Sequence, residues 1–324
     1  MTDSVTTDAE STPAPSASDG LVSSIGAPVI LALLVVYVVW GSTYLAIRYV
    51  VATMPPYLSA AVRFTVAGLV LYPWAIRRGG AEQRRADRPT RRHWLSALII
   101  GGMLLAFGNG TVSVAERSVP SGTAALLVGM VPLWMALFGR LQYKERLTPV
   151  AVVGLLVGFG GVALLVGGGS GHLKASGVAL LVVATLAWAV GSLYARGAPM
   201  PARPLVGTAM EMIAGGAVCI IMGAATGEFS RIHLDKFRAS SWIGLAYLIV
   251  FGSLFAYSAY TWLLRNAPTP LVSTYAYVNP AVAVFLGWLI ASEQLTARTA
   301  IAAAVIVVGV ALIVSGPWMS RRRA

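Results

Sequence analysis

Ten apolar stretches, separated by short polar connections, follow one another from residue 28 onward. A helix needs about 20 apolar residues to cross the hydrocarbon core of a bilayer, and each stretch is close to that length. The pattern therefore predicts an all-α membrane protein with ten transmembrane helices. The predicted spans are 28–50, 56–76, 94–112, 119–141, 149–167, 177–196, 205–226, 241–264, 270–291 and 299–316.

The N-terminal segment 1–27 has a different composition from the spans. It is rich in Ser, Thr, Ala and Pro and carries four acids and no Lys or Arg, so it lacks the basic start of a secretory signal. We interpret it as a disordered cytoplasmic tail. The connections between spans are marked by turn and capping residues such as Pro55-Pro56 and Thr148-Pro149, and none is long enough for a further folded domain.

The overall composition excludes a water-soluble enzyme and a disordered chain. Hydrophobic residues make up 57% of the 324 residues and charged residues only 11%, whereas soluble proteins carry about a quarter charged residues. The net charge of +12 would suggest nucleic acid in a soluble protein. The single cysteine, Cys219, excludes a disulfide framework and a Cys-based zinc site, and we expect it to pack in an apolar span.

The basic residues are distributed unevenly between alternate connections. With a cytoplasmic N-terminus, sixteen Lys and Arg fall on the cytoplasmic side and six on the other side. The positive-inside rule then predicts that both termini are cytoplasmic. This orientation explains most of the positive charge, so we expect no nucleic acid as a partner. The Arg-rich connection 77–93 can also contact anionic lipid headgroups.

The chain matches itself at an offset of 148 residues, without a gap. Trp40 corresponds to Trp188, Pro132 to Pro280, and Glu145 to Glu293, and the first five spans shifted by 148 reproduce the other five within a few residues. Because each unit has an odd number of spans, the second unit enters the membrane from the opposite side. Inverted repeats of this kind are typical of secondary transporters with a substrate site near the midplane. The alternative is a duplicated membrane scaffold without transport.

Several motifs stand out along the spans: the stretch from Trp40 to Arg48 (WGSTYLAIR), Pro55-Pro56, the stretch from Ala61 to Phe64 (AVRF), and Pro132 with Glu145 and Pro280 with Glu293. Together they resemble the EamA family of the drug/metabolite transporter superfamily, and its YedA-type branch in particular. The resemblance covers about 28–316 and implies two inverted EamA repeats, which we assign to 28–167 and 176–316, followed by a basic cytoplasmic tail, 317–324. It also implies efflux of small metabolites or drugs across the inner (plasma) membrane, through a cavity lined mainly by spans 1, 3, 4, 6, 8 and 9. Ser292 departs from the family, which commonly has Gly before this Glu.

Arg63 and Glu211 are the charged side chains well inside the spans, and the offset of 148 relates them. Each is about seven residues from the start of its helix, but the two helices start on opposite faces. The groups should therefore differ in depth by roughly 10 Å, which argues against a direct ion pair. Glu211 is the candidate proton-coupling group, and Arg63 is the candidate to attract an anionic substrate. The structural alternative ties each to a neighbouring carbonyl or hydroxyl.

Two prolines occupy equivalent positions near the centres of spans 4 and 9. Pro132 and Pro280 lack an N–H, so the carbonyls of Val128 and Ala276 are left free near mid-membrane. Either these carbonyls contact substrate or the prolines form kinks that shape packing. Other candidates for a substrate cavity are polar and aromatic residues that could also join helices or lie at the interface. They are Trp40, Ser42, Tyr44, Asn109, Trp188, Ser192, Tyr257, Tyr260, Tyr275 and Asn279.

The remaining charged and small residues favour structural roles. Glu145 and Glu293 lie at helix ends beside short turns, where we expect helix capping. Arg48 lies near the outer end of span 1, where its side chain can reach the membrane surface. Gly154 and Gly158 permit a close helix contact, which we interpret as a possible homodimer interface.

The functional hypothesis is a secondary transporter that exports small organic, amino-acid-like metabolites or drugs by alternating access. The three histidines are scattered in connections and no Walker motif occurs, so we expect no metal site, no cofactor and no ATP. The alternatives are a polytopic membrane enzyme and a non-transporting scaffold or channel. An intramembrane enzyme needs a nucleophile–base pair, metal ligands or a carboxylate cluster, which the spans lack.

Overall fold

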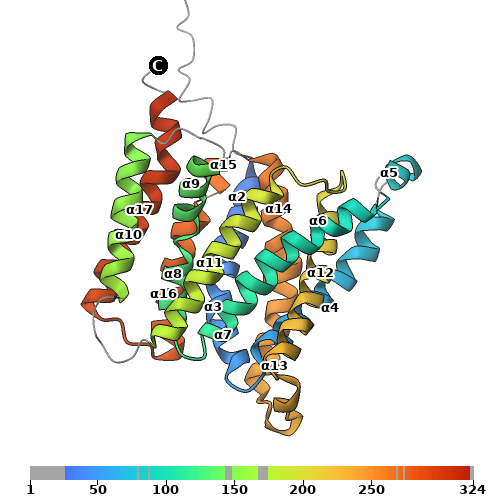
Figure 1. Cartoon of the computed structure of the whole chain (residues 1–324), viewed down its shortest axis with the longest axis horizontal. Coiled ribbons are helices and arrows are strands. Elements are labelled where there is room, and N and C mark those ends of the chain that lie inside the picture. The colour runs from blue at the N-terminus through green and yellow to red at the C-terminus, as the bar shows by residue number, and fades with distance from the viewer. Residues whose placement is uncertain are drawn as a thin grey trace, which may run out of the picture.

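The protein is almost entirely helical. The computed structural model describes residues 26–78, 80–86, 88–142, 148–166, 174–267, 269–272 and 274–321, and these contain helices and connections but no strand (Figure 1). In these ranges eight helices are long and apolar enough to cross a membrane, and the shorter apolar helices Val278–Ala291 and Ala297–Ile313 follow them. The predicted ten-span architecture is confirmed. The tail predicted over 1–27 lies almost wholly outside the described residues, as do 322–324.

The first half of the chain forms five spans. The first span consists of α2 (Ala27–Val35), the π-helical segment η1 (Val36–Trp40) and α3 (Gly41–Val51), and the second is α4 (Pro56–Arg77). The third consists of α6 (Arg91–Gly101), the π-helical segment η2 (Gly102–Gly110) and α7 (Thr111–Ala115). The fourth consists of α8 (Ser121–Val128) and α9 (Val131–Gln142), and the fifth is α10 (Pro149–Val166). The short α5 (Ala81–Ala86) lies in the Arg-rich connection.

The second half repeats this arrangement. The sixth span is α11 (Ala175–Ala195), and the seventh is α12 (Pro204–Ala225). The eighth consists of α13 (Ala239–Tyr247), the π-helical segment η5 (Leu248–Tyr257) and α14 (Ser258–Asn266). The ninth consists of α15 (Thr269–Val272) and α16 (Tyr275–Ala291), and the tenth is α17 (Ala297–Arg321). The single-turn 3₁₀ helices η3 (Phe229–Arg231) and η4 (Leu234–Lys236) connect α12 to α13. The last helix continues to Arg321, five residues beyond the predicted end of its span.

The offset of 148 residues relates the helix boundaries themselves. Shifting α4 by 148 gives the bounds of α12, and the span Arg91–Ala115 becomes Ala239–Leu263. Both third spans also contain a π-helical segment at nearly the same place, η2 and η5. Because π-helical turns displace side chains from regular α-helical positions, they often occur at functional sites. The repeat in the sequence is therefore a repeat in local backbone structure.

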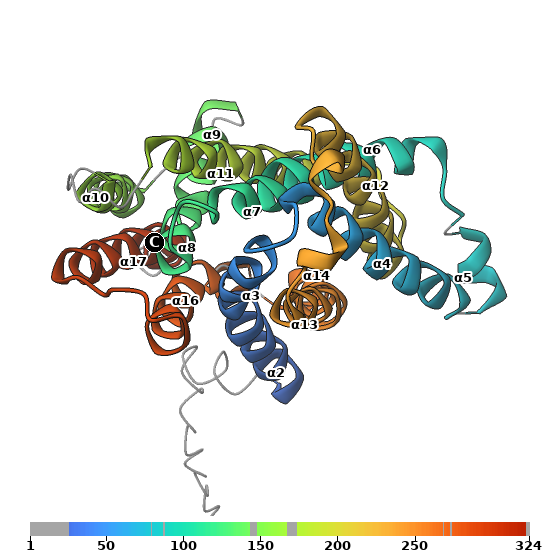
Figure 2. The ribbon, with the colours of Figure 1, turned by 90° about the horizontal axis from the view of Figure 1, so that it is seen from below.

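Equivalent helices from the two halves pack against each other through glycines. A Cβ atom on Gly68 of α4 would lie 2.7 Å from the side chain of Ile213, and one on Gly216 of α12 would clash with Oγ1 of Thr65. Gly68 and Gly216 are related by the offset, so each half supplies the same small residue to this crossing. Figure 2 shows the α10–α17 pair at one edge of the molecule and α4 with α12 toward the other, with α3, α8 and α16 between them.

The Gly154 and Gly158 motif lies within this fold. A Cβ atom on Gly309 of α17 would approach the Cα of Gly158 to 2.5 Å and the carbonyl oxygen of Gly154 to 2.8 Å. Both glycines of α10 are buried against α17 in the same chain. The interpretation of this motif as a contact between two copies of the chain is therefore wrong, because the chain's own tenth span already occupies the surface.

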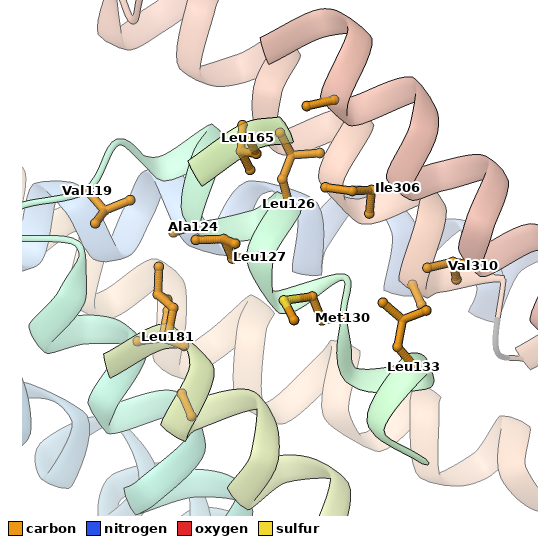
Figure 3. Close-up of a cluster of buried hydrophobic side chains, with 14 of the residues drawn as sticks. Val119, Ala124, Leu126, Leu127, Met130, Leu133, Leu165, Leu181, Ile306 and Val310 are labelled. Atoms are coloured by element: carbon orange, nitrogen blue, oxygen red, sulfur yellow. The ribbon is translucent and has the colours of Figure 1, made fainter. Parts of the chain in front are cut away.

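The largest apolar cluster surrounds α8, in the middle of the molecule. Leu126 and Leu127 of α8 are fully buried, together with Leu181 of α11 and Ile306 of α17 (Figure 3). Every residue from Ser121 to Leu127 is buried, which is expected for a short apolar helix enclosed on all sides. By contrast, outward side chains such as Leu156, with 68% exposed, present an apolar surface for lipid. The central helix is thus enclosed by apolar side chains from both halves of the chain.

Candidate functional site

A cavity of about 90 Å³ lies between the two halves. Since a single water needs roughly 10–15 Å³, the cavity has room for several waters or a small solute. Its lining comes from spans 1, 3, 4, 6, 8 and 9, as the family resemblance implied, and also from spans 2 and 7. In the described part of the chain, α10 and α17 contribute no lining residue.

The lining consists largely of residue pairs related by the offset of 148. One member of each pair comes from the first half and one from the second, so the cavity lies on the axis that relates the halves. The pairs include Trp40 and Trp188, Phe64 and Met212, Leu105 and Ser253, Asn109 and Tyr257, Val131 and Asn279, and Pro132 and Pro280.

Arg63 is the charged group of the cavity lining. Its side chain is 5% exposed, its Nε donates to Oγ of Ser253 at 3.0 Å, and its Nη1 donates to Oδ1 of Asn109 at 3.2 Å. The guanidinium also stands 4.8 Å from the centre of the Phe64 ring. Among the described residues, Arg63 has no carboxylate within salt-bridge distance. Its positive charge is therefore balanced only by neutral partners and an aromatic face, a costly arrangement in an apolar interior.

Gly252 makes room for this guanidinium. A Cβ atom at Gly252 would lie 3.1 Å from Nη2 of Arg63 and 3.2 Å from Cγ2 of Thr43, tighter than ordinary van der Waals contact. The glycine belongs to η5, the π-helical segment that also positions Ser253. The backbone of η5, in the second half of the chain, thus makes room for the guanidinium of Arg63, which belongs to the first half.

Glu211 lies behind the cavity wall. It is half-buried on α12, and its Oε2 accepts a hydrogen bond of 2.7 Å from the hydroxyl of Tyr257, which lines the cavity. No ion pair joins Glu211 to Arg63 among the described residues, in keeping with the expected difference in depth. Any ligand in the cavity would contact Tyr257 before it reached Glu211.

An aromatic cluster contributes to the wall of the cavity. The ring of Trp40 lies 4.9 Å from Tyr260 and 5.4 Å from Tyr275, and Tyr260 and Tyr275 meet edge to face at 5.5 Å. Trp40 also donates to the carbonyl of Gly252 at 3.4 Å. These contacts bring together four aromatic residues singled out in the sequence, since Tyr257 lies 6.3 Å from Trp40 as well.

The two prolines have different local structures. Span 4 is interrupted just before Pro132, between α8 and α9, whereas Pro280 lies inside α16. Both prolines line the cavity, as do Val128 and Ala276, the residues four positions before them. Next to Pro280, Asn279 is 6% exposed and its Oδ1 has no hydrogen-bond partner in the described part of the chain. Among the described residues this part of the lining therefore offers an unpaired acceptor, Oδ1 of Asn279.

Three sequence candidates do not line the cavity. Ser42 faces α13, where its hydroxyl lies 2.6 Å from that of Tyr247. Ser192 is also absent from the lining, and Tyr260 stands behind Trp40 and Tyr275 as part of the aromatic cluster. The direction of Ser42 follows from the helix geometry. It lies two residues from both Trp40 and Tyr44, which face the cavity, and residues two apart in a helix point to opposite faces. Polarity alone did not reveal which face of the helix each residue occupies.

Charged groups meet at the start of α8, outside the cavity lining. Nε of Arg48 lies 3.4 Å from Oε1 of Glu293, so Arg48 forms an ion pair rather than extending to the membrane surface. Oε1 of Glu293 also accepts from the backbone N–H and hydroxyl of Ser121, both at 2.8 Å, and Oε2 accepts from the N–H of Gly122 at 3.0 Å. Glu293 therefore caps α8, as predicted. Glu145 lies outside the described residues.

Sequence reasoning missed two buried carboxylates on this side. Glu228 accepts from the backbone N–H groups of Tyr57 and Leu58 at 3.2 and 2.9 Å and so caps α4. Both α4 and α8 follow a proline at the N-cap, which has no side-chain acceptor, and a remote carboxylate takes that role. Glu116, immediately after α7, is 2% exposed. It follows an apolar span and precedes Arg117, a pattern typical of an exposed connection.

Comparison with known proteins identifies the family. The EamA-like transporter family matches the chain twice, over residues 27–167 and 175–315. The chain belongs to this family. As an EamA transporter it is a multi-pass membrane protein with a small solute as substrate, and the alternative of a membrane enzyme is excluded.

Individual relatives of this EamA transporter agree over nearly the whole chain. The uncharacterized inner membrane transporter YedA of Escherichia coli (strain K12) is 38% identical over 90% of this chain and 92% of its own. The uncharacterized transporter YvbV of Bacillus subtilis is 25% identical over 88% of this chain and 90% of its own. A solved crystal structure at 22% identity covers 91% of this chain and 98% of that chain with a TM-score of 0.63, which shows the fold alone.

Proposed function

We propose that this EamA transporter exports a small amphipathic organic solute with an anionic group, such as an amino-acid-like metabolite or a drug. One observation carries the proposal: Arg63 is buried in the cavity wall with only neutral hydrogen-bond partners among the described residues. A carboxylate entering the cavity would supply the missing negative charge through strong, charge-assisted hydrogen bonds. The aromatic rings of Trp40, Trp188 and Tyr275 would hold the apolar part of the solute.

Alternating access is the mechanism that the internal symmetry favours. Two similar halves can exchange conformations, so states open to either side can have similar energies. We propose that the aromatic cluster around Trp40 and the ion pair of Arg48 with Glu293 are the two closures that open in turn. We propose an inner-membrane location with both termini cytoplasmic, on the basis of the distribution of basic residues and the description of the YedA relative.

Glu211 is the proposed proton-coupling group. Its carboxylate is bound to the hydroxyl of Tyr257, and Tyr257 lines the cavity. A solute that displaced the tyrosine hydroxyl would remove this hydrogen bond and favour the protonated carboxyl. Substrate binding and proton binding at Glu211 would then be linked.

Transport in reconstituted vesicles tests the proposal. Purified protein is placed in liposomes, and the movement of matched anionic, zwitterionic and cationic solutes is measured with and without a pH gradient. We expect carboxylate-bearing solutes to move and their cationic analogues not to, with faster movement under the gradient. Equal movement of the cationic analogues would refute the role of Arg63, and a lack of any movement across a broad panel would refute the transport proposal.

A further inference from the structure

We propose that Glu116 is a proton-binding site that controls the ion pair of Arg48 with Glu293, the charged closure of the proposed transport cycle. In the closed state Glu116 carries a proton and Arg48 pairs with Glu293. When Glu116 loses the proton, it competes with Glu293 for Arg48 and the closure loosens. The inference extends the proposed function, because it takes this closure as one of the two that alternate, but its test needs no substrate.

The carboxyl of Glu116 is enclosed without a hydrogen-bond partner. Glu116 is 2% exposed, and both Oε1 and Oε2 are buried with no partner in the part of the chain that the structure describes. An ionised carboxylate in that position would lose its hydration without compensation, which is far costlier than burying the neutral acid. The geometry alone therefore favours the protonated form.

The neighbouring negative charge of Glu293 also favours the protonated form of Glu116. Within this cluster Glu293 already uses the positive charge of Arg48, at 3.4 Å, and also accepts three hydrogen bonds from the start of α8. Burial first, and then the negative charge of Glu293, raise the pKa of Glu116 well above its ordinary value, and Arg48 offsets this only in part. A second negative charge would leave two carboxylates competing for one guanidinium.

Other titratable groups near this end do not replace Arg48. The titratable groups on the elements packed against α7, and in the connections beside it, include Tyr44, Arg48 and Tyr49 of α3, Tyr57 and Arg63 of α4, Lys174 before α11, Glu228 before η3, Glu293 after α16, and Arg117 next in the chain. Tyr72 and Arg77 of α4 and Tyr194 of α11 lie toward the other ends of their helices. Tyr44 is within electrostatic reach of Glu116 but can supply only a neutral hydroxyl. Arg117 and Lys174 are exposed, and Arg63 is bound to Ser253 and Asn109.

The cluster is connected to the cavity through α8. Glu293 holds the first N–H groups of α8, and Ala125, one turn further along that helix, lines the cavity. Arg48 follows Ile47, another lining residue. A change of partner by Arg48 would therefore alter the charge and position of the group that caps a cavity-lining helix.

Thiol accessibility tests this proton site. Ala125→Cys in a Cys219→Ala background gives a chain with one cysteine, at a position that is 1% exposed. Its reaction with a polar maleimide is followed from pH 5 to pH 9 in detergent, with and without Glu116→Gln. Because the same cysteine is measured in both, the thiol's own titration cancels in the ratio of the two rates.

As the pH increases from 5 to 9, we expect the labelling rate of the protein that keeps Glu116 to rise about tenfold relative to the rate of the Glu116→Gln variant. Arg48→Ala, which removes the shared cation, should be labelled rapidly at every pH. A ratio that stays constant with pH would overturn the proposal, whatever the transport assays show. If Glu116→Gln does not fold, infrared difference spectra of Glu116→Asp provide the test. A pH-dependent carboxylic acid band that shifts with this substitution would support proton binding at Glu116, and a band that does not shift would overturn it.

Discussion

Arg63 donates a hydrogen bond to Asn109 in the first half, at 3.2 Å, from the second span to the third. At the positions 148 residues later, Tyr257 donates one to Glu211 at 2.7 Å, from the eighth span to the seventh. The same contact thus occurs twice with opposite charge and opposite direction of donation. Duplication preserved the geometry, while divergence placed a cation on one side of the symmetry axis and an anion on the other.

Substitutions at Arg63 should separate charge from shape. Arg63→Lys keeps a positive charge but loses the planar fork that binds both Ser253 and Asn109, so we expect roughly tenfold weaker apparent affinity for a carboxylate solute. Arg63→Gln should reduce transport of that solute by about a hundredfold, because a buried charge-assisted bond contributes about 1.5–3 kcal/mol. Initial rates in vesicles measure both effects. Unchanged selectivity between anionic and cationic solutes in Arg63→Gln would contradict the assignment.

Changes at Glu211 and Tyr257 test proton coupling. Glu211→Gln keeps a group able to accept from the Tyr257 hydroxyl but cannot exchange a proton, so transport should continue without responding to a pH gradient. Tyr257→Phe removes the hydrogen bond and should shift the pH dependence without abolishing it. The measurement is the ratio of rates with and without the gradient. Persistent gradient dependence in Glu211→Gln would exclude Glu211 as the coupling group.

A methyl group at Gly252 should disturb the site without unfolding the protein. The added Cβ would lie 3.1 Å from Nη2 of Arg63, so the guanidinium must move by a few tenths of an ångström. We expect Gly252→Ala to raise the apparent KM several-fold with a modest change in melting temperature. Gly102→Ala is the matched control, because its Cβ would make an ordinary contact of 3.8 Å with Val218. Similar kinetics in the two variants would show that Arg63 is not held by this contact.

The packing of α10 against α17 should be disrupted by alanine at Gly309 but should tolerate alanine at Gly160. Gly309→Ala would place a Cβ 2.5 Å from the backbone of Gly158, and such overpacking typically costs about 1–3 kcal/mol. Gly160→Ala on α10 meets nothing within 4 Å and should be neutral or slightly stabilising, since Ala favours helix. Thermal unfolding in detergent compares them. Equal melting temperatures would mean that the two helices are not packed this closely.

Glu116 should make the folded state less stable as the pH rises. Its pKa is raised from 4.5 on folding, by burial and by Glu293, so its contribution to stability is complete below 4.5. That contribution is lost as the pH rises through the raised value, at about 1.4 kcal/mol for each unit of difference. Melting temperatures should therefore fall with pH in the unmodified protein and remain flatter in Glu116→Gln. Glu82→Gln, at an exposed position, should follow the unmodified protein.

The sequence by itself determined the membrane architecture, because hydrophobic length and internal repetition are local and additive properties. Ten apolar stretches and the offset of 148 predicted the spans and the two units, and the rarity of charge inside them singled out Arg63 and Glu211. The tertiary structure decided which face of each helix meets the cavity. It excluded Ser42 and Ser192 from the lining, brought Arg48 to Glu293, and enclosed Glu116 at a position where the sequence resembles a connection. Those outcomes depend on how each helix is rotated and on contacts between residues about 200 positions apart. The pattern of apolar residues along the chain carries no information about either.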